Sequence, residues 1–242
     1  MKSTRRTWAC AAVLAGTALM FVSSAAGDIS GFLTTATSGV TATDGWGPSG
    51  AGFKIAWDIN FTGSAWHYEY TITNATGGNL RKGLSHILIG LSDNFTATDW
   101  SGWLLNSVAT TPDEAPKTYH PSDPGNSNPN LPGNIYGGKF SLNGGTTAAL
   151  EFDSNRAPAW HDFYAKDGTS GGVWVTAWNA SFGVGVLNPD DYTHPPTDAG
   201  GHTLFKILSP DSRGGPVVPA PGAALLGALG LGVVGWIKRR GA

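Results

Sequence analysis

The sequence predicts an all-β fold, a single β-sandwich or jelly-roll-like domain over residues 27–208. Short segments alternate apolar and polar residues, and turns rich in glycine and asparagine separate them. Between the two chain ends no stretch shows a convincing helical period. Charged residues make up only 13% of the chain, while Gly, Thr, Asn and Trp are plentiful, which is typical of an exported β-protein.

The clearest strands form a hairpin. Five apolar residues alternate with polar ones in the first strand: Phe53, Ile55, Trp57, Ile59 and Phe61. After the Gly63-Ser64 turn, Trp66–Ile72 alternates in the same way. The continuous apolar run 84–91 indicates a central strand, and further strands are expected at 135–142, 147–152, 173–179, 182–187 and 204–208.

Two segments interrupt this pattern. Residues 110–134 are rich in proline and poor in apolar residues, and a loop of that length is usually functional or disordered. Residues 209–218, rich in proline and glycine, are expected to form a linker between the domain and the C-terminal tail.

The N-terminus has the features of a secretory signal peptide, residues 1–26. Basic residues precede an apolar run from Trp8 to Val22, and small residues follow at Ser24-Ala25-Ala26. We expect cleavage after Ala26, so that the mature chain begins at Gly27, with cleavage after Ala25 as the alternative. Cys10 is removed with the signal, which leaves no cysteine for a disulfide.

The C-terminus predicts a transmembrane helix at residues 222–237. Its 16 residues are apolar and include five glycines, which membrane helices tolerate better than soluble ones. The basic cluster Lys238, Arg239 and Arg240 follows, and the positive-inside rule keeps it in the cytoplasm. The domain is therefore expected to face outward.

The tail 219–242 resembles the PEP-CTERM sorting signal of exported bacterial proteins. In that signal a Pro-Glu-Pro motif precedes a transmembrane helix and an Arg-rich end. Here the motif reads Pro219-Ala220-Pro221, a Pro-Ala-Pro variant with alanine in place of glutamate. The resemblance implies processing by an exosortase-type enzyme and delivery to the cell surface or the extracellular matrix.

Four strings inside the domain are similar to a group of exported PEP-CTERM proteins. They are WHYEYTITN at 66–74, LSHILIGLSDNFT at 84–96, GNSNPNLPGNIYGGKF at 125–140 and DFYAKDG at 162–168. This similarity supports the interpretation of the tail and implies no catalytic residues.

The charge of the domain argues against nucleic acid as a partner. Residues 27–216 contain nine basic and 17 acidic residues, a net charge of −8. A surface of this sign repels phosphate backbones.

Candidates for chemistry are few. Glu69 and Glu151 lie in predicted strands and would suit a glycosidase if they faced one groove, although a solvated sheet face is the simpler interpretation. The six histidines show no zinc spacing, and no serine lies in a nucleophile elbow. Calcium is a candidate cofactor through two groups of oxygen ligands: Asp190, Asp191 and Asp198; or Asp123, Asn126, Asn128 and Asn130. Closing turns is the commoner role of such residues.

Eight tryptophans lie in the domain. Trp57, Trp66 and Trp174 alternate with apolar residues and are expected in the core. Trp100 and Trp103 border the long loop and are the candidates for stacking on a glycan.

The sequence therefore predicts an exported, membrane-anchored, non-enzymatic surface or matrix protein. The alternatives are a glycan-binding module, with an extracellular polysaccharide as partner, and a glycosidase acting on polysaccharide.

Overall fold

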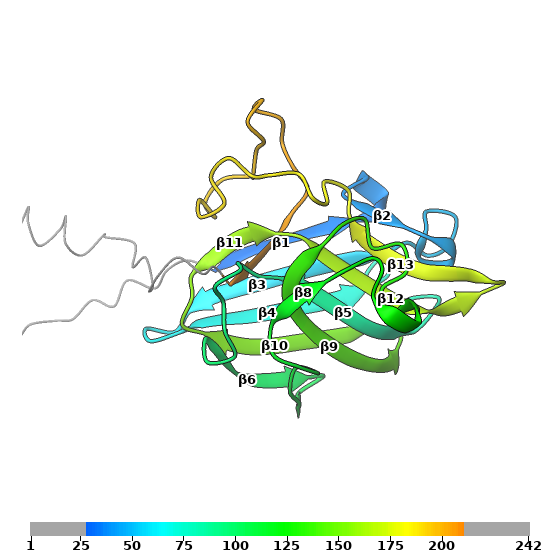
Figure 1. Ribbon diagram of the computed structural model, residues 1–242, viewed down its shortest axis with the longest axis horizontal. Helices are drawn as coiled ribbons and strands as arrows, with labels where there is room; N and C mark the ends of the chain where they lie inside the picture. The colour runs from blue at the N-terminus through cyan, green and yellow to red at the C-terminus, as the bar shows by residue number, and fades with distance from the viewer. Residues whose placement is uncertain (1–27, 211–242) are drawn as a thin grey trace, which may run out of the picture. The chain divides into compact units, whose positions relative to one another are not determined.

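The structure, a computed structural model, describes residues 28–210 (Figure 1). This part of the chain is built from strands and three short 3₁₀-helices, Thr35–Thr37, Asp44–Trp46 and Pro124–Asn126. The strands are β1 (Ile29–Thr34), β2 (Val40–Ala42), β3 (Lys54–Phe61), β4 (Trp66–Thr73), β5 (Leu84–Gly90), β6 (Trp100–Leu105), β7 (Val108–Ala109), β8 (Lys117–Tyr119), β9 (Ile135–Gly145), β10 (Ala148–Ser154), β11 (Pro158–His161), β12 (Phe163–Ser170), β13 (Val173–Asn179) and β14 (Ile207–Pro210).

The strands form two six-stranded antiparallel sheets in a sandwich-like arrangement. Sheet A has the order β1-β3-β4-β10-β6-β7, and sheet B has the order β2-β13-β12-β5-β9-β8. A small third sheet pairs β11 with β14. The predicted all-β class is confirmed, and Figure 1 shows the segment between β13 and β14, yellow to orange, projecting from one side of the sandwich.

The β3–β4 hairpin has the predicted register. Ile55 lies opposite Ile72, and Trp57 lies opposite Tyr70. Alternate residues of both strands are buried, as expected when one face of a sheet covers a core. The predicted central strand is also confirmed, because β5 pairs with both β12 and β9.

Aromatic side chains fill the space between the two sheets. Trp100 of sheet A lies 5.5 Å from Phe140 of sheet B and 5.4 Å from Phe152, measured between ring centroids. A side chain at Gly138 would approach the Trp100 ring to 2.1 Å. Glycine at position 138 therefore makes room for the indole that joins the sheets.

The long loop 110–134 covers the outer face of sheet B. Its residues Tyr119 and Leu131 are 2% and 3% exposed and pack in a second apolar cluster with Leu88, Ile135 and Tyr164. The Tyr164 hydroxyl donates a hydrogen bond to the Pro129 carbonyl at 2.6 Å. This segment thus supplies β8, the edge strand of sheet B, and the rest of it covers the sheet, held by apolar packing and hydrogen bonds.

The expected strand at 182–187 is wrong, because this segment consists of turns and irregular structure. Gly183 adopts a φ of 76°, which is incompatible with an extended strand, and Val184 and Leu187 are 41% and 58% exposed. The sequence analysis did not predict the strands β1, β2, β6, β7, β8, β11 and β12. Strand β14 runs through Ser209 and Pro210, residues expected to begin the linker.

The predicted signal peptide 1–26 and transmembrane helix 222–237 lie outside the described residues, as does nearly all of the predicted linker. Within residues 28–210, no helix is long and apolar enough to cross a membrane.

The contact between Trp100 and Gly138 gives a test of the sheet packing. We expect Gly138→Ala to destabilise the protein by about 1–3 kcal/mol, because the added methyl group overpacks the core against the indole. Urea unfolding of the full chain in detergent measures the loss. Gly168→Ala is the matched control, since no atom lies within 4 Å of a side chain added at that strand position. Equal stability of the two variants would contradict the packing described.

Candidate functional site

A groove with a volume of about 860 Å³ runs beside strand β1. One side is formed by the six consecutive residues 28–33, and the other by residues 192–196 together with Leu204, Lys206 and Leu208. Trp57 and Trp160 also line it. Because a whole strand follows one side, the groove has the length of that strand.

The aromatic lining of the groove depends on a glycine in β1. Gly31 lies directly opposite Trp57, and a side chain at Gly31 would approach the indole to 2.4 Å. Trp57 is 6% exposed and packs edge-on against Trp160 at a centroid distance of 6.1 Å. Tyr192 packs edge-on against Trp66 at 5.7 Å. The side of the groove formed by residues 192–196 is thus anchored through Tyr192 on the inner face of sheet A.

A buried ion pair holds the part of the groove's second side that Leu204, Lys206 and Leu208 form. Lys206 is 4% exposed, and its Nζ lies 2.5 Å from Asp162 Oδ1. The Nδ2 group of Asn179 donates to the same Asp162 oxygen at 2.7 Å and to the Phe205 carbonyl at 2.8 Å. The cluster therefore ties the segment before β14 to the strands β12 and β13.

This ion pair predicts unequal effects of removing its two partners. Asp162→Asn leaves a buried ammonium without its counter-ion, so we expect it to destabilise the protein by about 3–5 kcal/mol. Lys206→Met leaves the Asp162 carboxylate, but that side chain is 18% exposed and keeps its hydrogen bonds from Asn179 and Gly183, so the loss of stability should be smaller. Urea unfolding of both variants at pH 7 measures the difference. Equal losses of stability would show that the pair is not electrostatically coupled in this way.

The glutamates named as possible glycosidase residues lie side by side on the outer face of sheet A. Glu151 is directly opposite Glu69, and Glu69 is directly opposite Asp58. Cβ atoms of such cross-strand neighbours are about 4.5–5.5 Å apart. A hollow of about 440 Å³ is lined by Glu69 and Asp58 but not by Glu151. The two glutamates thus share a face, but not this hollow.

The expectation that Trp100 presents its ring to a glycan is corrected by its burial. Trp100 is 4% exposed, and rings on both sheets surround it. Trp103 is partly buried against Trp100, and its Nε1 is inaccessible to solvent. Both residues belong to β6, which the sequence analysis did not identify, and this strand carries the Trp100 ring into the core.

The candidate calcium ligands mainly close turns. Asp191 accepts hydrogen bonds from Thr193, and Asp198 accepts them from the backbone of Gly200 and His202. Asp123 accepts from the His120 backbone and from Asn128. Among the described residues, no group of three or more His, Cys, Asp or Glu side chains could hold a metal ion.

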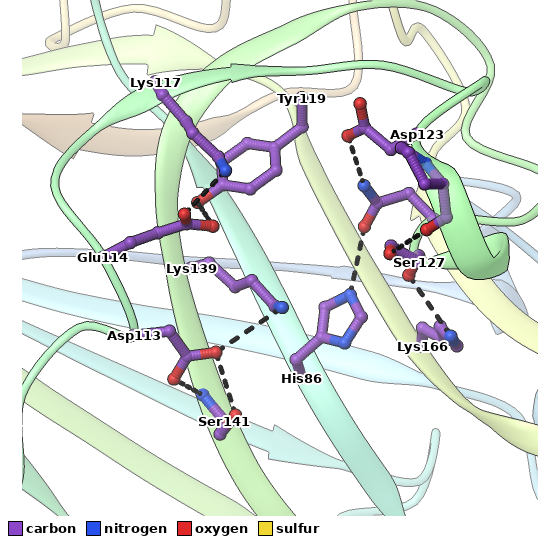
Figure 2. A network of polar contacts seen from close by, with 12 residues as sticks. His86, Asp113, Glu114, Lys117, Tyr119, Asp123, Ser127, Lys139, Ser141 and Lys166 are labelled. Carbon is purple, nitrogen blue, oxygen red and sulfur yellow. Dashed lines mark hydrogen bonds and ion pairs between the residues drawn. The ribbon is translucent and has the colours of Figure 1, made fainter.

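A polar network joins the long loop to sheet B, and Figure 2 shows its side chains. His86 of β5 is 5% exposed, and its Nε2 lies 3.2 Å from Oδ1 of Asn128 in the loop. Lys166 donates from Nζ to the Ser127 carbonyl at 3.2 Å. Asp113 accepts from Ser141 and lies 3.6 Å from Lys139. The network holds the loop at several points along its length.

The environment of His86 keeps its imidazole neutral. Burial, together with the positive charges of Lys139 and Lys166, lowers the pKa of His86 to about 4. The ordinary pKa of histidine is about 6.5. Unfolded chains therefore take up this proton at a higher pH than folded ones. The stability that depends on neutral His86 is complete above about pH 6.5 and is lost as the pH falls toward about 4.

We expect the free energy of unfolding to decrease between pH 6.5 and 4, with His86 contributing about 3 kcal/mol of the loss. His86→Gln keeps an amide donor for Asn128 but has no proton to take up, so its pH profile should be flatter. Chemical unfolding at several pH values measures this. His120→Gln, on the loop, is the control. Its free energy of unfolding should change with pH as that of the wild type does. A wild-type slope in His86→Gln would refute the assignment.

Comparisons with known proteins do not assign the domain. The sequence matches no family model and no curated protein. It is similar to one solved structure, described as the KRT10-binding region domain of the pneumococcal serine rich repeat protein PsrP. The identity is 13%, the match covers 76% of this chain and 98% of that chain, and the TM-score is 0.24. A likeness this weak carries no argument about function.

Proposed function

We propose that this chain is an exported, non-enzymatic protein of the cell surface or extracellular matrix, displayed by its C-terminal sorting tail. In this proposal residues 1–26 direct export, and the helix 222–237 holds the protein in the membrane. An exosortase-type enzyme then acts near Pro219-Ala220-Pro221, and the extracellular polysaccharide is the surrounding material.

The predicted signals at the two ends of the sequence support this proposal, and the ends of the described domain are compatible with it. Ile29 lies opposite Ile59, which lies opposite Tyr68. The Tyr68 hydroxyl donates to the Arg156 carbonyl at 2.8 Å, and shortly after it Pro158 pairs with Pro210. The first and last described residues are therefore at the same end of the sandwich. The turn at 171–172 between β12 and β13 lies at the opposite end of the sandwich (Figure 1).

The sorting function is tested by transferring the tail. We expect residues 212–242, fused to an unrelated exported reporter, to hold that reporter in the membrane fraction until the tail is processed. Each cation of the cluster 238–240 opposes passage through the bilayer centre by about 2.5–3.5 kcal/mol. Truncation of the native chain after Asp211 should release the domain into the periplasm or the medium.

The matched control for this transfer replaces Lys238, Arg239 and Arg240 by asparagine in the fusion. The control should be retained less well, because the tail can then be pulled through the bilayer. Fractionation followed by mass spectrometry of the tail distinguishes the outcomes. A freely soluble reporter that still carries the unmodified tail would contradict the proposal.

A further inference from the structure

The outer edge of β1 has unpaired backbone groups. The Thr35 N–H donates to the Phe53 carbonyl at 3.0 Å, next to the last β1–β3 pair. In an antiparallel pair, residues bonded to the partner alternate with residues that point away. Gly31 and Leu33 therefore bond β3, whereas Ser30 and Phe32 direct their N–H and C=O groups to the open edge. Within residues 28–210 these four groups have no strand partner.

The edge at β1 differs from the other three edges of the two large sheets. Strands β7, β2 and β8 have two, three and three residues, whereas β1 has six. No proline or charged residue interrupts the segment Ile29–Thr34. Short length, proline and charge are the features that usually prevent an edge from pairing with another strand. β1 has none of them.

The groove beside this edge offers apolar contacts on one side of an added strand. A strand paired to β1 would direct alternate side chains to the inner face, where Ile29, Gly31 and Leu33 point. Trp57, Trp160 and Leu208 line the groove there. Apolar side chains of an incoming strand would therefore be buried.

On the other side of an added strand, the position opposite Ser30 faces carboxylates, whereas the position opposite Phe32 faces the Phe32 ring, whose centroid lies 4.7 Å from Lys54 Nζ. An outward side chain opposite Ser30 would continue the row formed by Ser30, Asp58, Glu69 and Glu151. Among the described residues, none of the three carboxylates has an ion pair or hydrogen bond with another side chain. Ser30 is small and exposed, and it borders the hollow next to Asp58 and Glu69. Lysine or arginine on the added strand would reach these acids over Ser30.

We propose that the groove binds an extended peptide segment, which adds an antiparallel strand to β1. Its recognised chemistry is alternation, with apolar side chains toward Trp57 and Trp160 and basic side chains toward Asp58 and Glu69. Backbone hydrogen bonds to Ser30 and Phe32 supply the pairing, as in other cases of strand addition. This inference goes beyond the proposed function, and its test does not depend on how the chain is sorted.

The test uses a fluorescein-labelled peptide of alternating lysine and valine and the full chain in detergent micelles. In antiparallel addition the lysine N–H groups face β1, because directly opposed residues share a face. N-methylation of the lysines should weaken binding by about tenfold or more, through the loss of these hydrogen bonds. N-methylation of the valines should leave the affinity nearly unchanged. Both modified peptides keep their charge.

A protein variant tests the acidic side separately. Asp58→Asn should weaken binding of the unmodified peptide by about two- to fivefold, the effect expected from the loss of an exposed ion pair. Asp167→Asn, on sheet B, is the matched control and should bind like wild type. Absence of saturable binding at millimolar peptide would overturn the proposal. The proposal would also be overturned if the two methylated peptides bound with equal affinity, or if only methylation of the valines weakened binding. Binding of cellohexaose in the groove without binding of the peptide would overturn it as well.

Discussion

The buried ion pair between Lys206 and Asp162 is the constraint on which the shape of the groove depends. Two charges removed from water are stable only when they are paired and further hydrogen-bonded. Asn179 supplies that support to Asp162, and the Gly183 N–H adds a further hydrogen bond at 3.1 Å. Because Asp162 directly precedes β12, Asn179 ends β13, and Gly183 and Lys206 follow β13, the pair fixes the wall formed by Leu204 and Leu208.

At two points in this fold a glycine leaves space for a tryptophan ring. Gly138 receives the Trp100 ring and lets sheet A pack closely on sheet B. Gly31 leaves space for Trp57 in the edge strand of sheet A, beside the groove. In the first case the pairing completes the core. In the second it lines the groove next to an open strand.

The sequence could predict those strands whose alternation is uninterrupted, such as β3 and β4. It missed β6 and β12 because their periodicity is broken: Gly102 adopts a φ of 68°, and the pairing of β12 shifts between Lys166 and Thr169. The segment 182–187 has apolar residues at strand-like spacing, but its glycines form turns. Local alternation is informative only where the backbone stays extended.

The candidate site was less accessible to sequence analysis than the fold. Burial of Trp100 follows from its partners Phe140 and Phe152, which are distant in sequence. Strand β1 does carry a signal, since Ile29, Gly31 and Leu33 alternate, but glycine in place of an apolar residue weakens it. That its edge is open depends on the order of strands in sheet A, which pairing across the whole chain determines.

The openness of the β1 edge is the central claim, and amide hydrogen exchange measured by NMR tests it most directly. In the free protein, the amides of Ser30 and Phe32 should exchange rapidly, because they face the groove without an acceptor. Those of Gly31 and Leu33 should be protected by their bonds to β3. Protection of Ser30 and Phe32 equal to that of their neighbours would show that the edge is already paired, and would contradict this account.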